Sequence, residues 1–265
     1  MSEDAKSREP SSHNAPRMRS EMARSTHDTV VVRGFDLTSE LMGKIDLGGM
    51  AFLELTGRLP NEGESIVFNA MLVSLVEHGI TPSTIAARLT YLGAPEALQG
   101  AVAAGILGVG SVFVGTIEGA ARMLQEALQN AGANPDLEAL AAEIVTDHRS
   151  RTQAIPGFGH PIHKPVDPRA VRLFELAERH GLAGDHVRLV KLIQFELNRQ
   201  TGRSLPINVT GAIGAIAGEL DIPWSICRGL GIMARSIGLV GHLLEEMRQP
   251  ISAEIWLRVQ GEAES

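Results

Sequence analysis

The segment 156–169 holds the residues with the clearest potential for chemistry. It overlaps the stretch Arg149–Pro168, which is rich in Pro, Gly and His, has no helical or strand periodicity and is therefore predicted to be a long loop. Its glycines would let the backbone approach a ligand. His160, Lys164 and Arg169 follow those glycines, and such side chains beside a helix start could bind a carboxylate or a phosphate. The same residues also fit a Gly/Pro turn with solvated cations.

Other candidate residues lie on predicted helices. His78 stands at the end of an apolar helical pattern, where a lone histidine is more often structural than functional. Arg235 stands among Ile, Gly and Leu, and a buried arginine there would need an anionic partner. Arg248 lies at a helix end and could equally be a solvated cation that interacts with the helix dipole.

Helices must position these residues, because apolar side chains recur at helical spacing along most of the chain. Capping residues, Pro at first turns and Gly at ends set the boundaries. A short strand is predicted over Thr29–Gly34. The predicted helices are Thr38–Ile45, Asp46–Gly57, Glu62–His78, Pro82–Gly93, Pro95–Leu107, Val112–Leu128, Pro135–His148, Pro168–His180, Asp185–Gln200, one from about Gly211, and Pro223–Met247. An all-α protein of about ten helices, in two lobes, is therefore expected.

Composition excludes several classes of protein. The formal net charge of −7 argues against nucleic-acid binding, although a few arginines in a cleft can still attract a small anion. Apolar runs are too interrupted for a membrane span, and no secretory signal is visible, so a cytoplasmic location is expected. The single cysteine, Cys227, excludes an internal disulfide and a cysteine-based metal cluster, and the sequence offers no metal site.

The segment Gly157–Arg169 reads Gly-Phe-Gly-His-x-Ile-x-Lys-x-x-Asp-Pro-Arg and resembles the signature of the citrate synthase superfamily. The resemblance implies that His160 contacts the carbonyl of the oxaloacetate-derived part and that Arg169 binds its carboxylate. It also implies that Gly157, Phe158, Gly159 and Lys164 hold coenzyme A, and we expect Arg203 to meet the coenzyme A phosphates as well.

Further segments are similar to the citryl-CoA lyase branch of that superfamily, the C-terminal module of ATP-citrate lyase. Glu77-His78-Gly79 resembles its Asp-His-Gly segment, which implies that His78 binds the citrate or oxaloacetate end. Phe113 stands where synthases have a histidine and the lyase module has Phe. Arg235, in Ala234–His242, matches a substrate-carboxylate ligand, and Arg248 matches an arginine that reaches into the neighbouring subunit's site. The resemblance extends over about Val30–Pro250.

One position departs from the family pattern. Where the family reads Asn-Val-Asp, this chain reads Asn208-Val209-Thr210. The family's aspartate is the general base towards acetyl-CoA, so the resemblance gives that catalytic position to Thr210. The pKa of a threonine hydroxyl is too high for a base near neutral pH, and loss of an acid–base group typically costs about 100- to 10,000-fold in rate.

The resemblance implies the citrate synthase fold, with residues 29–115 and 216–265 in a large lobe, 116–215 in a small lobe and 1–28 as a disordered tail. The expected substrates are a coenzyme A thioester and a di- or tricarboxylate, and the expected assembly is a homodimer or a dimer of dimers. Cleavage of citryl-CoA to acetyl-CoA and oxaloacetate is the leading hypothesis. The alternative, motivated by Thr210, is a catalytically impaired relative that binds such ligands; a third is thioester hydrolysis.

Overall fold

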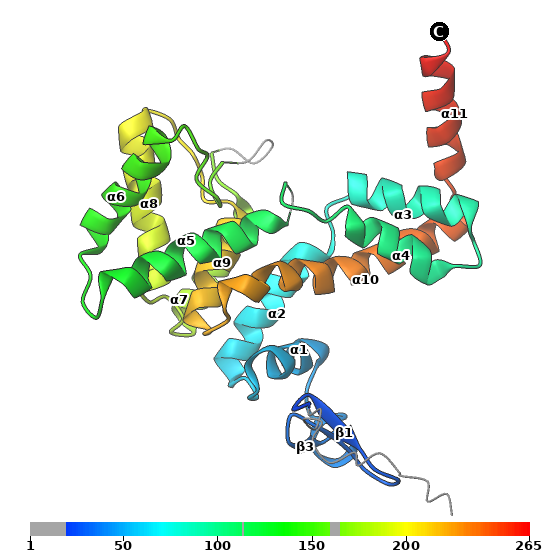
Figure 1. Cartoon of the computed structure of the whole chain (residues 1–265), viewed down its shortest axis with the longest axis horizontal. Coiled ribbons are helices and arrows are strands. Elements are labelled where there is room, and N and C mark those ends of the chain that lie inside the picture. Colours follow the sequence, from blue (N-terminus) through cyan, green and yellow to red (C-terminus); the bar gives the residue numbers. More distant parts are fainter. Residues whose placement is uncertain (1–19, 113, 160–164) are drawn as a thin grey trace, which may run out of the picture. The chain divides into compact units, whose positions relative to one another are not determined.

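The structure is a computed structural model that describes residues 20–112, 114–159 and 165–265. Its backbone contacts divide the chain into two units, Met1–Asp46 and Leu47–Ser265. The predicted all-helical class is confirmed, because eleven α-helices and one small sheet lie in the described residues (Figure 1).

The first unit contains a three-stranded antiparallel sheet in the order β1-β2-β3: Ala23–Ser25, Val30–Val32 and Phe35–Asp36. β2 confirms the predicted strand, whereas β1 lies within the segment expected to be a disordered tail. The predicted helix Thr38–Ile45 was wrong, since a single helical turn, η1 (Leu37–Leu41), replaces it. Met42 is extended and Gly43 has a φ of +76°, which ends the turn.

The second unit consists of helices joined by short connections, apart from the longer segment 151–167 between α6 and α7. Its helices are α1 (Leu47–Thr56), α2 (Glu62–Val76), α3 (Pro82–Gly93), α4 (Leu98–Leu107), α5 (Gly115–Ala131), α6 (Leu137–Ser150), α7 (Pro168–Arg179), α8 (Asp185–Thr201), α9 (Val209–Glu219), the short turn η2 (Trp224–Ile226), α10 (Cys227–Arg248) and α11 (Ser252–Ala263).

Local capping explains several of the helix boundaries. Asn61 and Glu64 form a reciprocal capping box at the start of α2, with Glu64 N donating to Asn61 Oδ1 at 2.9 Å. Thr81 caps α3, and Pro82 occupies its first turn. α8 ends at Gly202, whose left-handed φ of +65° suits glycine.

The differences from the sequence prediction include two late helix starts and one helix that was not predicted. α4 begins at Leu98, three residues after Pro95, and α5 begins at Gly115. α11 was not predicted, and its residues are mostly exposed with only Ser252 buried. Its start depends on a contact with α10 that sequence periodicity does not reveal.

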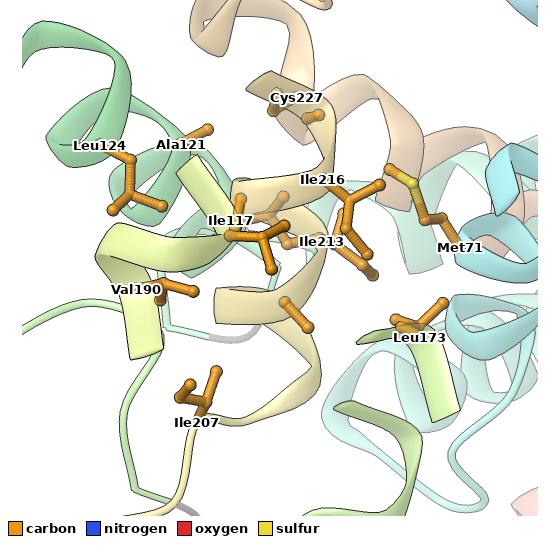
Figure 2. Close-up of a cluster of buried hydrophobic side chains, with 14 of the residues drawn as sticks. Met71, Ile117, Ala121, Leu124, Leu173, Val190, Ile207, Ile213, Ile216 and Cys227 are labelled. Carbon is orange, nitrogen blue, oxygen red and sulfur yellow. The ribbon is translucent and has the colours of Figure 1, made fainter. Parts of the chain in front are cut away.

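The core of the second unit gathers around α9, from which Val209 to Gly218 are buried apart from Thr210. α9 packs against α5, α7 and α8, while α10 packs against α2, α3, α4 and α5. Figure 2 shows the buried side chains around Ile213 and Ile216, contributed by several of these helices. Full burial of each such isoleucine stabilises the fold by about 1.5–3 kcal/mol relative to exposure. The first turn of α9 is thereby anchored rigidly where the candidate site lies.

None of the helices within the described residues is long and apolar enough to cross a membrane.

Candidate functional site

A cavity of 480 Å³ lies where the ends of several helices of the second unit meet. It is bounded by the end of α2, the start of α3, the end of α4, the first turns of α5, α7 and α9, the glycine loop, and α10. The lining residues are Ser74, Leu75, Glu77, His78, Thr81, Ser83, Gly108, Val109, Val112, Val114, Thr116, Phe158, Gly159, Arg169, Asn208, Val209, Thr210 and Arg235. Two open hollows of 630 and 910 Å³ beside α6 contain no predicted site residue.

The glycine loop is joined to the segment before α9. Gly159 N donates to Pro206 O at 2.8 Å, and Asn208 N donates to Gly157 O at 3.0 Å. Gly157 has a φ of +89°, and a Cβ there would lie 2.6 Å from the Cα of Gly211. Gly157 is therefore buried as a close-packing residue behind the cavity, while Phe158 and Gly159 line it.

Arg169 is held at the first turn of α7 by the helix cap, Asp167. Arg169 Nη2 donates to Asp167 Oδ2 at 2.9 Å and Nε donates to Oδ1 at 3.1 Å. Val209 N also donates to Asp167 Oδ2, at 2.9 Å, which links α7 to α9. Burial acts to raise the pKa of Asp167, but these hydrogen bonds hold it below its usual value. Asp167 thus fixes the guanidinium on the cavity wall.

Thr210 lies on the first turn of α9, next to the cap residue Asn208. Asn208 Oδ1 accepts hydrogen bonds from Thr210 N at 3.0 Å, Thr210 Oγ1 at 2.6 Å and Gly211 N at 3.1 Å. Asn208 Nδ2 donates to Gly159 O at 2.8 Å, which fixes the orientation of the amide. The Thr210 hydroxyl proton is therefore engaged in a hydrogen bond to Asn208. Only the lone pairs of the Thr210 hydroxyl oxygen face the cavity.

Arg235 projects from α10 into the cavity, with its side chain 11% exposed. Its Nη1 lies 3.9 Å from Glu77 Oε1. Within the described residues this buried Nη1 has no hydrogen-bond partner. Burial lowers the pKa of the guanidinium, and the charge of Glu77 opposes that effect. A buried cation with an unpaired donor facing a cavity is suited to binding an anion.

Glu77 is a cavity residue that sequence reasoning did not single out. Its Oε1 accepts hydrogen bonds from His78 N at 2.8 Å, Gly79 N at 2.7 Å and His242 Nε2 at 2.9 Å. Burial acts to raise its pKa, but these hydrogen bonds bring it below the usual value. The sequence signal that could have pointed to Glu77 is the spacing of Arg235, His242 and Glu246. This spacing places the three charged or polar side chains on one face of α10, where they need partners on a neighbouring helix.

The cavity brings together six predicted site residues: His78, Phe158, Gly159, Arg169, Thr210 and Arg235. Gly157, Arg203 and Arg248 do not line it, and the two arginines are exposed. His160 and Lys164, like Phe113, lie outside the described residues.

Comparisons with known proteins identify the family of the chain. Residues 27–256 match the family described as citrate synthase, C-terminal domain. The chain is 31% identical over 199 residues to the citrate/2-methylcitrate synthase of Bacillus subtilis, covering 72% of this chain and 50% of that protein. It is 29% identical over 197 residues to the citrate synthase of Heyndrickxia coagulans, with 72% and 50% covered. The chain thus spans about half the length of these relatives.

Solved structures show the same likeness. Citryl-CoA lyase from Hydrogenobacter thermophilus has a TM-score of 0.80 and 35% identity, covering 88% of each chain. ATP citrate lyase from Methanothrix soehngenii, solved with citrate and coenzyme A, has a TM-score of 0.75 and 24% identity. It covers 89% of this chain and 39% of that one, a likeness of fold alone.

The fold defines an all-helical protein of citrate synthase type, and its candidate site is a cavity formed by helix ends and lined by Arg169 and Arg235. The chain belongs to the citrate synthase family.

Proposed function

We propose that this protein acts on a coenzyme A thioester and a di- or tricarboxylate, cleaving citryl-CoA to acetyl-CoA and oxaloacetate. The observation that carries the proposal is the convergence of His78, Arg169, Arg235 and Thr210 on one cavity. The structural likeness to citryl-CoA lyase from Hydrogenobacter thermophilus supports the choice of substrate.

In this reaction the hydroxyl proton of the citryl group leaves, and the bond from the carbinol carbon to the methylene beside the thioester breaks. The electron pair of that bond becomes the enolate of acetyl-CoA, which then takes up a proton. Arg169, Arg235 and His78 orient the carboxylates. His160 polarises the hydroxyl or keto oxygen, and Lys164 and Arg203 bind the coenzyme A phosphates.

Thr210 motivates the second candidate function, a protein that binds such ligands with little turnover. Its hydroxyl proton is donated to Asn208 Oδ1 at 2.6 Å, and a threonine is not an acid near neutral pH. Another group must therefore protonate the enolate if the lyase is active.

The deciding experiment mixes the purified protein with citryl-CoA and follows oxaloacetate release, with Thr210→Asp and the shape-matched Thr210→Asn beside it. Cleavage by the wild type supports the lyase. Activity only in Thr210→Asp, about 100-fold or more above the other two, supports the binding function instead. No activity in any variant, together with no binding of citrate or coenzyme A, contradicts both functions.

We also propose a homodimer, with Arg248 reaching the neighbouring subunit's site. Ile237, Val240, Leu244 and Met247 recur at helical spacing on α10 and are each about half exposed in the single chain. Val73 on α2 is also exposed, at 71%, and we propose that α2 contributes to the same interface. Burial of such side chains against a second copy would stabilise the assembly. The division into two lobes and the cytoplasmic location stay predictions.

A further inference from the structure

A buried arginine organises a charged cluster next to the cavity wall. Arg88, on α3, is fully buried. Its Nη1 donates to Glu246 Oε2 at 2.7 Å, and its Nη2 contacts His242 Nδ1 at 2.8 Å and also Glu245. Glu246 in turn accepts from Ser252 N at 2.9 Å, at the start of α11. The cluster thus ties α3 and α11 to α10.

Arg88 determines the tautomer of His242. A guanidinium can only donate hydrogen bonds, so His242 Nδ1 must be the acceptor in this contact. The ring proton of neutral His242 then lies on Nε2, which donates to Glu77 Oε1 at 2.9 Å. The Arg88 cluster is therefore connected to the cavity through one oriented hydrogen bond.

Glu77 Oε1 accepts three hydrogen bonds: the one from His242 Nε2 and two from the backbone donors His78 N and Gly79 N. Arg235 Nη1 lies 3.9 Å from the same oxygen, which is too far for a hydrogen bond but close enough for electrostatic attraction. α10 can approach the end of α2 this closely because position 238 is glycine, where a Cβ would collide with Val76 O.

We propose that Glu77 is a positioning residue, held by His242 and Arg88, that draws the Arg235 guanidinium into the cavity without occupying its Nη1. The buried Nη1 then remains available for a carboxylate of the ligand. The inference rests on the proposed function and deepens it, because it says how Arg235, one of the residues proposed to bind a substrate carboxylate, is held in place.

The main test measures the affinity for citrate, with coenzyme A present, by titration calorimetry. Glu77→Gln keeps the shape and removes the charge, and we expect it to bind citrate about 10-fold or more weakly. Glu77→Asp retains the charge and should bind more tightly than Glu77→Gln. His242→Gln should weaken binding as well, and adding it to Glu77→Gln should cost little more, because His242 acts through Glu77.

The pair His186–Glu219 provides a matched control, since it is also a histidine–carboxylate contact, at 3.7 Å, and does not line the cavity. His186→Gln should leave citrate affinity unchanged whatever it does to the melting temperature. If Glu77→Gln binds citrate as tightly as the wild type or more tightly, Glu77 does not position Arg235 and the inference is wrong, while the proposed function stands.

A measurement without ligand separates the two proposals. The ¹⁵N signal of the Arg235 Nε–H, assigned with Arg235→Lys, reports whether the guanidinium is held in place. We expect slow hydrogen exchange in the wild type and clearly faster exchange in Glu77→Gln; unchanged exchange contradicts the inference. A wild type that binds no citrate contradicts the proposed function, and this signal still decides the role of Glu77.

Discussion

The hydroxyl of Thr210 donates a hydrogen bond to Asn208 Oδ1 at 2.6 Å, at the position that the sequence resemblance matches to the family's aspartate. The same oxygen accepts from two backbone amides and caps α9. Thr210 is thus part of the helix cap that faces the cavity, and its proton is not available to a ligand. We therefore expect Thr210 to act as part of the helix cap and not as an acid–base group.

Replacement of Thr210 by Val tests this interpretation. The variant loses one of three hydrogen bonds to Asn208, so we expect the free energy of unfolding to fall by about 1 kcal/mol. Turnover of citryl-CoA should fall by much less than the roughly 100-fold that marks loss of an acid–base group. Oxaloacetate release and urea unfolding measure the two quantities.

Thr201→Val is the control, because the Thr201 hydroxyl also makes one helix hydrogen bond, to Leu197 O at 2.7 Å, away from the cavity. The two variants should lose similar stability. A collapse of turnover in Thr210→Val alone would mean that the hydroxyl takes part in the chemistry.

Asp167 makes stability depend on pH. Its pKa is held below the usual value of about 3.9, so its contribution to stability is fully present above that value. The contribution is lost as pH falls through the lowered pKa of the folded state. Asp167→Asn should therefore cost about 3 kcal/mol at pH 7, because it leaves Arg169 without its carboxylate, and progressively less below about pH 4.

Urea unfolding of both proteins at pH 7 and at the lowest pH where the wild type is folded measures this difference. Asp136→Asn serves as the control, since Asp136 caps α6 with hydrogen bonds from Glu138 N and Ala139 N, both at 3.1 Å, and has no arginine partner in the part of the chain that the structure describes. It should cost only about 1 kcal/mol. Equal losses in the two variants would show that the Asp167–Arg169 pair adds nothing to the cap.

Sequence patterns predicted the elements whose boundaries depend on local chemistry. The cap Asp167 and the first-turn Pro168 define the start of α7, and Pro82 defines that of α3. α11 was missed because its start is held by a distant carboxylate, that of Glu246, through Ser252. Amphipathic spacing carries no information about such a contact.

The candidate site was predicted in part, and the omissions have a physical cause. Arg169 and Arg235 were recognised by motif, and the fold brings both to one cavity. Glu77, His242 and Arg88 were given no role, because their roles arise only when α2, α3 and α10 pack together. Gly157 was expected to hold coenzyme A, yet it packs against Gly211 and does not line the cavity.

Gly157→Ala should distort the glycine loop. The new Cβ would lie 2.6 Å from Gly211 Cα and would also require a φ of +89°. We expect a loss of about 2–4 kcal/mol in the free energy of unfolding, from strain and overpacking together. Gly132→Ala is the control, because its φ is +81° and no atom lies within 4 Å of the added Cβ. It should lose only about 1 kcal/mol. Equal losses would mean that the Gly157–Gly211 contact has no special importance.

Cys227 should be unreactive in the folded protein. The thiol is fully buried at the start of α10, and burial, assisted by the charge of Glu118, raises its pKa to about 12. Since the thiolate is the reactive form, an aromatic disulfide reagent at pH 8 should modify it only as fast as the protein opens. Reagent absorbance in buffer and in urea checks this: we expect one thiol per chain in urea and almost none without it. Rapid, stoichiometric reaction in buffer would show that the helix packing around α9 and α10 opens readily, and would contradict the rigid core that supports the cavity.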